Sequence, residues 1–278
     1  MIKKVTLFVF LTATILVYAQ NNNQNLNDYK VSISGWVSSE TIQDTRQVIQ
    51  AREGDVILYP AREKLDANGE DINSTASFNM FSIHSRVRLK VSGPEMFGAK
   101  TSALIESDFV GTSNDAISLV RLRHAILKLE WEKTTLQAGQ YWHPFFVLSS
   151  YPQVSGWGGG LPYAILSRNP QVRFTQKLTE NISATLTALT DRDFASTGPL
   201  GTSSVYMRNS GQPEFDLHVE YKNKGWSTGF VVGRKEIKPR LEDLQGLKMT
   251  KTLESYQANV YARKDINNFT AKIQGLYG

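Results

Sequence analysis

Charged side chains that alternate with apolar ones are the residues best placed to do chemistry. One segment carries a basic side chain at every second position, at His84, Arg86, Arg88 and Lys90. The next segment carries Glu106 and Asp108 with the same spacing. Because side chains alternate between the two faces of a strand, each row lies on one face. Arg and Lys rows along a narrow aqueous space favour anions, so the predicted chemistry is electrostatic selection of solutes.

The pairing of these rows depends on where the chain turns between them. If it turns around Gly93–Gly98, Lys90 faces Lys100. In the same register Arg86 faces Leu104, and His84 faces Glu106. Further charged residues share the predicted polar face, namely Lys100, Arg173, Arg263, Glu214, Asp216 and Glu220. Solvated ion pairs without any selective role are the alternative, because charge rows often form a solvated face.

Signals of catalysis are missing from the sequence. It contains no P-loop or H-E-x-x-H motif. The four His residues are far apart in the sequence, and the absence of Cys excludes disulfides and thiolate metal sites. We therefore expect no enzyme, no cofactor and no metal, with an outer-membrane enzyme as the weakest alternative.

Period-two alternation defines the elements that position these charges. Eleven segments show it, and no segment reads as a convincing amphipathic helix. The segments are 29–38, 81–91, 99–109, 124–131, 136–142, 171–178, 182–188, 214–221, 226–232, 255–263 and 269–277. Each has one apolar and one polar face, which predicts an all-β fold.

The connections alternate between long and short along the chain. Long or intermediate ones cover 39–79, 111–119, 143–170, 191–212 and 233–251, whereas 93–98, 132–134, 179–181, 222–225 and 264–268 are short. This layout is typical of a transmembrane antiparallel up-and-down β-barrel. The apolar face would then meet lipid, and the polar face a wet lumen. Alternation alone also fits a soluble lipocalin-like or sandwich protein, in which the apolar face forms the core.

Aromatic residues on the apolar face fall beside the short connections or at the start of the first strand. These are Tyr29, Trp131, Tyr221, Trp226 and Phe269. Amphipathic rings prefer the membrane interface, so the set predicts an aromatic girdle. Ordinary strand-end aromatics are the alternative, because strands favour such residues anyway.

The connection 143–170 is rich in aromatic and glycine residues. It contains Phe145, Phe146, Tyr151, Trp157, Gly158, Gly159, Gly160 and Tyr163. A loop that folds into the barrel would bury the rings and narrow the passage, so we predict a constriction loop. Deletion of residues 157–160 should then raise conductance. Packing against a neighbouring protomer is the alternative.

Two features depart from a regular barrel. Arg121 and Arg123 share the parity of Ala125 and would face lipid, unless they lie above the membrane or a bulge near His124 resets the parity. The sequence leaves both explanations open. In addition, single-chain bacterial barrels have even strand numbers. We therefore expect a fragment that lacks C-terminal strands.

The first residues have the pattern of an export signal. Lys3 and Lys4 precede an apolar run, and Ala19 is a suitable cleavage position. Residues 1–19 are predicted to be the signal peptide, 20–28 a flexible mature N-terminus and 29–278 the barrel. Cleavage would lower the formal charge from +5 to +3, which gives no case for nucleic-acid binding.

Several motifs resemble a porin family of Bacteroidetes-type Gram-negative bacteria, related to the phosphate-selective and dicarboxylate-type porins. The motifs are residues 44–47 (DTRQ), 51–55 (AREGD), 58–60 (LYP), 122–125 (LRHA) and 138–144 (AGQYWHP). The resemblance spans most of residues 29–278. It implies a porin-like outer-membrane channel, often a homo-oligomeric trimer, with a loop folded into the pore, and it implies no catalytic residues.

The sequence thus predicts a passive diffusion channel for small hydrophilic solutes, with a mild anion preference. Its expected partners are outer-membrane lipid, the solutes and further copies of the chain. A surface-binding or adhesion barrel that uses the connection 39–79 is the alternative function.

Overall fold

An antiparallel sheet of eleven strands dominates the computed structural model, which describes residues 28–152, 154 and 165–278. The strands follow one another as neighbours in chain order, apart from shorter strands in two of the connections. They are β1 (Lys30–Trp36), β6 (Arg86–Met96), β7 (Ala99–Asp108), β8 (Arg121–Glu130), β9 (Thr134–Trp142), β10 (Arg168–Lys177), β11 (Ile182–Leu189), β14 (Glu214–Asn223), β15 (Trp226–Ile237), β16 (Leu253–Ile266) and β17 (Phe269–Tyr277). Among the described residues, the edge strands β1 and β17 do not pair with each other, so the sheet is open.

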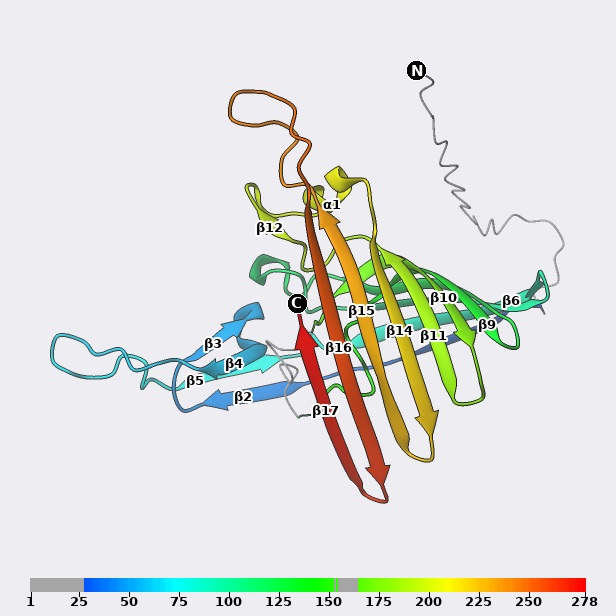
Figure 1. The fold of residues 1–278 in the computed structure, drawn as a ribbon. Helices are drawn as coiled ribbons and strands as arrows, with labels where there is room; N and C mark the ends of the chain where they lie inside the picture. The colour runs from blue at the N-terminus through cyan, green and yellow to red at the C-terminus, as the bar shows by residue number, and fades with distance from the viewer. Residues whose placement is uncertain (1–27, 153, 155–164) are drawn as a thin grey trace, which may run out of the picture.

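The eleven strands confirm the alternation pattern and the all-β fold, although the second begins at Arg86 and not at residue 81. The alternation of connections is confirmed as well, because the tight turns gather at one end of the sheet and the long connections at the other (Figure 1). Residues with positive φ form the tight turns, such as Phe97 (55°) with Gly98 (72°) and Lys224 (45°) with Gly225 (77°). Positive φ at both central residues suits the twist of a two-residue hairpin.

Two long connections have more regular structure than their sequence predicts. In 39–79, β2 (Glu40–Asp44) pairs with β5 (Ser77–Phe81), and β3 (Val48–Ala51) pairs with β4 (Val56–Pro60). The connection after β11 contains β12 (Thr197–Gly198), β13 (Gly201–Thr202) and helix α1 (Val205–Ser210). These elements are short, so their periodicity is too brief to identify from sequence.

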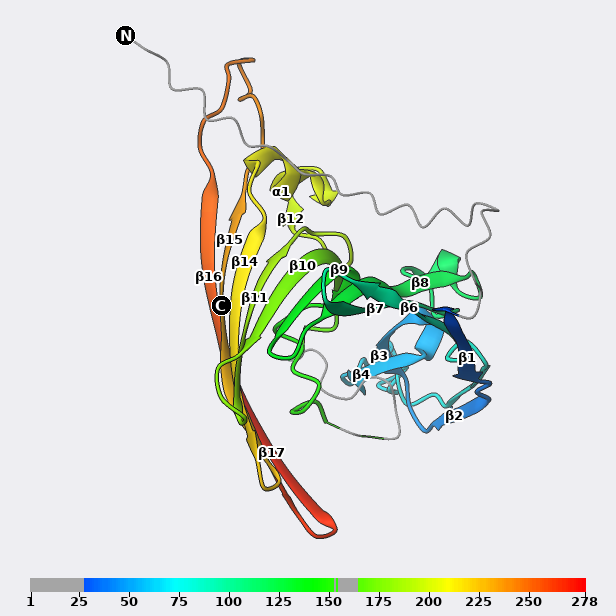
Figure 2. The ribbon, with the colours of Figure 1, turned by 90° about the vertical axis from the view of Figure 1, so that its right-hand side faces the viewer.

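The sheet curls so that β14–β17 stand opposite β6–β8 (Figure 2). Its outer face is apolar and exposed. One row of cross-strand neighbours on this face runs through Leu136, Phe174, Leu186, Leu217 and Val232. Leu186 is 52% exposed, and Val260 and Ile273, farther along the sheet, are 62% and 72% exposed. A soluble protein would cover such a face, so the described chain has the arrangement expected for contact with lipid.

Buried polar residues lie on the opposite, inner face, which also carries the few buried apolar side chains of the sheet. The buried polar set includes Glu106, Asp108, Thr187, Glu214, Asp216 and Asn259. Hydrophobic packing is limited to small clusters, one of which joins Phe145 and Val147 to Val231 and Tyr261. Within the described residues, none of the helices has the length and apolar character needed to cross a membrane.

Candidate functional site on the inner face of the sheet

A β-bulge on β8 determines where the arginines of that strand point. Glu106 pairs with His124, but the next residue of β7, Ser107, pairs with Leu122. Arg123 is therefore the extra residue, and the parity of β8 changes there. Arg121 and Arg123 both reach the inner face, where they bind Asp108. Of the two explanations that the sequence left open, the bulge is the one that the structure shows.

Glu106 and Asp108 are the centre of a network of four arginines. Arg123 donates from Nε to Glu106 Oε1 at 2.7 Å and from Nη1 to Asp108 Oδ2 at 2.5 Å. Arg121 binds both oxygens of Asp108, at 2.8 and 2.7 Å. Arg88 binds Glu106 Oε2. Glu106 is 1% exposed and Asp108 is 0% exposed, so water screens these charges little.

The other face of Glu106 is closed by Arg86. Its Nη1 lies 3.5 Å from Glu106 Oε1, and its guanidinium stacks 4.3 Å from the ring centre of Trp36, directly opposite on β1. Four guanidiniums and two carboxylates thus share one patch, which we call the arginine cluster (Arg86, Arg88, Arg121, Arg123, Glu106 and Asp108). Its formal charge is positive.

The predicted register of the first hairpin is wrong by four residues. Lys90 faces Leu104 instead of Lys100, and Arg88 faces Glu106. The reason is that β6 continues through Pro94 to Met96, past an irregularity after Gly93, and the chain turns at Phe97 and Gly98. Lys100 is paired with Glu130 on the next strand.

His84 does not belong to the strand row. The chain turns at Ser82–Ser85, where the Ser85 amide donates to the Ser82 carbonyl at 3.1 Å. His84 is 4% exposed, and its Nε2 lies 2.7 Å from Oδ1 of Asp55, in the connection 39–79. Lys90 is exposed, whereas Arg88 is partly covered. The solvent exposure of the basic side chains therefore varies along the row.

The remaining predicted charges lie on the inner face of the later strands, away from the arginine cluster. Arg173 donates to the carbonyl of Trp142 and to Gln171 Oε1. Glu220 accepts hydrogen bonds from Ser227 and Tyr261, and Arg263 donates to Asp265. Glu214 and Asp216 are each 1% exposed. The predicted basic and acidic rows therefore form separate local networks.

Residues 143–151 of the predicted constriction loop cross the inner face and dock on β15–β17. Phe145 and Val147 pack against Val231 and Tyr261. The backbone carbonyl of Phe145 accepts from Asn259 Nδ2 at 3.2 Å, and that of Tyr151 accepts from Lys272 Nζ at 2.7 Å.

Side-chain rings continue along the same segment. Phe146 lies between Trp142 and Tyr151, with ring centres 4.4 and 4.9 Å away. The segment is therefore anchored by apolar contacts and by hydrogen bonds to its backbone. The predicted members Trp157, Gly158, Gly159, Gly160 and Tyr163 lie outside the described residues.

Sequence reasoning missed two residues that support the arginine cluster. Arg168 is buried, and its guanidinium stacks 3.9 Å from the Trp142 ring centre. The guanidinium carbon of Arg123 lies 5.7 Å from the same ring centre. The motif QYWHP at 140–144 marks this position in the sequence. No local pattern, however, joins residue 142 to residues 123 and 168.

Outside the sheet, Asp193 faces the arginine cluster from the connection after β11. Burial is the main influence on its carboxyl group and raises its pKa, while Arg168 and Arg121 oppose that rise. Arg168 Nη1 lies 3.9 Å from Asp193 Oδ2. The acid thus adds negative charge beside Arg168 when it is ionised.

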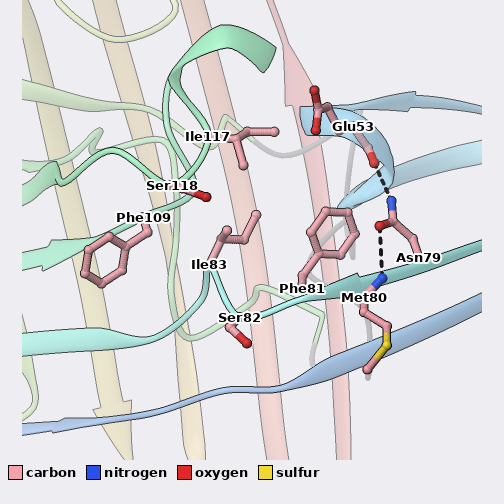
Figure 3. Close-up of a pocket in the computed structure, with 9 residues that line it drawn as sticks. All are labelled: Glu53, Asn79, Met80, Phe81, Ser82, Ile83, Phe109, Ile117 and Ser118. Carbon is pink, nitrogen blue, oxygen red and sulfur yellow. Dashed lines mark hydrogen bonds between the residues drawn. The ribbon is translucent and has the colours of Figure 1, made fainter.

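A pocket of about 380 Å³ lies apart from this network, between β5 and the connection after β7 (Figure 3). Its walls are mainly Phe81, Ile83, Phe109 and Ile117. Asn79 closes one side by donating to the Glu53 carbonyl at 2.6 Å. The pocket has no convergent set of charged groups among its described lining residues.

No family model matches the chain, and no curated protein matches it. Solved structures do. The outer membrane channel DcaP of Acinetobacter baumannii matches with a TM-score of 0.64 at 18% identity, over 91% of this chain and 65% of that one.

This match shows a shared fold. The chain has the strand architecture of DcaP and spans 65% of the length of that protein. The anion-selective porin from Comamonas acidovorans matches more weakly, with a TM-score of 0.44 at 10% identity, over 89% of this chain and 78% of that one.

Proposed function

We propose that the chain is an outer-membrane porin that conducts small hydrophilic solutes by passive diffusion. The observation that carries this proposal is the inversion of the sheet, with exposed apolar side chains on the outer face and buried charges on the inner face. An exposed apolar outer face is stabilised by lipid, and a polar inner face suits a water-filled passage. The shared fold with DcaP supports the proposal.

The passage selects by charge as well as by width. The arginine cluster has more guanidiniums than carboxylates, and exposed Lys90 and Lys100 extend its positive field along β6 and β7. Rings of Arg and Lys favour anions in pores. We therefore propose a mild anion preference. Small phosphate- or dicarboxylate-type solutes are suitable candidates because paired guanidiniums bind such groups.

The docked segment 143–151 supports a constriction role for its loop. It occupies the inner face at β15–β17, where it removes cross-section from the passage. The girdle residues Tyr221, Trp226 and Phe269 are 37%, 46% and 65% exposed at the tight-turn end, where an interface would hold them. Export by the N-terminal signal and assembly into a homo-oligomer complete the proposal.

Planar bilayer recording tests the function directly. The purified chain, inserted from detergent, should form water-filled channels with stepwise conductance. Absence of channels from correctly folded protein would favour a surface-binding barrel or an outer-membrane enzyme instead.

The reversal potential in a KCl gradient tests the anion preference. Arg88→Glu should shift it toward cation selectivity, because the partly exposed Arg88 borders the passage. Arg240→Glu, which makes the same charge change in the connection after β15, is the matched control and should have little effect. A cation-selective parent channel would contradict the charge argument.

A further inference from the structure

Three donor groups converge where the 143–151 segment meets the wall at β14. A nitrogen of His143, an oxygen of Glu214 and an oxygen of Asp216 all lie within 4.8 Å of one another. His143 Nε2 is 3.2 Å from Glu214 Oε1. The three residues are 6%, 1% and 1% exposed. The group combines a loop residue with two residues of one strand.

Asp216 is the observation that points to a ligand. Neither of its carboxylate oxygens has a hydrogen-bond partner, although both are buried. The hydroxyl group of Thr187, its cross-strand neighbour on β11, is also buried without a partner. Burying a carboxylate with no compensating group is costly, so an occupant is expected at this point.

Gly233 leaves the room that the carboxylate needs. It is the neighbour of Asp216 on β15, and a Cβ atom there would lie 2.2 Å from Asp216 Oδ1. The same Cβ would meet Phe145 at 3.0 Å. The absence of a side chain at 233 therefore lets both Asp216 and the docked loop approach the wall.

The nearby cations offset the charge of the two carboxylates only in part. Lys235 Nζ is 2.8 Å from Asp191 Oδ1 but 3.9 Å from Glu214 Oε2. Arg173 donates to Gln171 and to the Trp142 carbonyl. Glu214 accepts from the uncharged amide of Gln257. Two adjacent buried carboxylates therefore need a shared proton or a bound cation.

We propose that His143, Glu214 and Asp216 bind a divalent transition-metal ion of the Zn²⁺ type. Imidazole with two carboxylates is a donor set that suits Zn²⁺, whereas Ca²⁺ and Mg²⁺ prefer oxygen ligands alone. Tetrahedral bonds of about 2.0–2.1 Å place donors about 3.4 Å apart. Donor atoms that now lie up to 4.8 Å apart would therefore move closer together on binding.

Coordination through Nε2 moves the imidazole proton to Nδ1. The weak 3.3 Å hydrogen bond from the Phe145 amide to Nδ1 would be lost. In exchange, the ion would fasten the beginning of the loop to β14. The site is independent of the proposed channel function, since it requires only the observed geometry.

Zinc binding to the full chain in detergent tests the site. The Asp55→Asn variant serves as parent, because Glu40, Asp55 and His84 form a second group that could hold Zn²⁺. After chelator treatment, this parent should retain one equivalent of Zn²⁺ through gel filtration. Asp216→Asn and His143→Gln should each lower the affinity about 100-fold or more.

Controls keep the result interpretable. Heat-modifiable electrophoretic mobility establishes that each variant is folded, and Asp216→Asn preserves side-chain shape. Excess Mg²⁺ or Ca²⁺ should leave Zn²⁺ bound. No zinc binding by the folded parent, an affinity equal to the parent's in both variants, or displacement by Ca²⁺ would each overturn the proposal. The first of these results would mean that the two carboxylates share a proton.

Discussion

At the scale of single residues, the arginine cluster shows how buried charge is tolerated in the sheet. Each carboxylate accepts hydrogen bonds from two guanidiniums: Glu106 from Arg88 and Arg123, and Asp108 from Arg121 and Arg123. Such pairs contribute little net stability when intact, because desolvation offsets attraction. Breaking one leaves a buried charge without its partner, which is far more costly.

Glu106→Gln should therefore destabilise the chain strongly. We expect a loss of about 3–5 kcal/mol in the free energy of unfolding, measured by denaturant titration in lipid or detergent. The matched control is Glu130→Gln on the neighbouring strand. Its partner Lys128 is 2.6 Å away, with side chains 35% and 49% exposed, so the loss should stay below about 1 kcal/mol. Equal effects would contradict the buried-pair argument.

Asp71 provides a pH test outside the sheet. The backbone amide of Lys64 is the main cause of its lowered pKa, assisted by the amide of Asn73 and by Arg46. A lowered pKa means that the stabilisation is complete above the unfolded value. It is lost as pH falls through the folded pKa, which lies below the ordinary pKa of an Asp carboxyl group.

Hydrogen exchange at the amides of Lys64 and Asn73 measures this effect. Protection, corrected for intrinsic rates, should fall with acidification in the parent and depend less on pH in Asp71→Asn. The amides of Gln245 and Leu247, which donate to Asp243 in another connection, serve as the internal control. Unchanged protection of Lys64 in the variant would refute the assignment.

At the scale of elements, the docked segment 143–151 joins a connection to the far strands of the sheet. Phe145 is 2% exposed and lies against Val231, and Asn259 holds its carbonyl. The contact with Asn259 joins residues 114 positions apart in the sequence. The position of the loop therefore depends on the curvature that brings β15 and β16 beneath it.

Phe145→Ala should release this segment. Removing a buried Phe side chain costs about 3–5 kcal/mol, which exceeds what the few hydrogen bonds can retain. We expect faster proteolysis within 143–152 and, if the channel proposal holds, a larger single-channel conductance. Phe194→Ala, at a residue 68% exposed, is the control and should change neither. Slow proteolysis in both variants would show that Phe145 is not the anchor.

At the scale of the whole molecule, the outer apolar face defines the environment that the fold requires. Leu186 and Leu217 are cross-strand neighbours on this face, both exposed. In water such a surface promotes aggregation, whereas in a bilayer it contacts the apolar acyl chains of the lipid. In a soluble β protein the apolar side chains of such alternating strands form the core, whereas here they lie on the outer face.

Leu186→Arg should destabilise the folded chain in lipid by about 2–4 kcal/mol. Ser183→Arg places the same side chain on the inner face of the same strand and should cost much less. Unfolding titrations in lipid vesicles compare the two directly. A larger loss for Ser183→Arg would reverse our assignment of the faces.

Sequence alone suffices to locate most of the eleven strands, the alternation of their connections, and one apolar and one polar face on each strand. These features follow from the two-residue alternation of apolar and polar side chains, which can be recognised within each segment of about ten residues. The position of Lys90 relative to Lys100 was not determined, because strand continuation through Pro94 moves the turn. Register depends on the turn, and a shift of four residues preserves every face.

Which groups meet depends on the tertiary structure. It showed the bulge that turns Arg123 inward, the stacking of Arg168 on Trp142 and the convergence of His143 with Asp216. The physical reason is that these contacts join distant parts of the chain through one extra residue or through sheet curvature. Neither a single bulge nor curvature leaves a periodic trace in sequence.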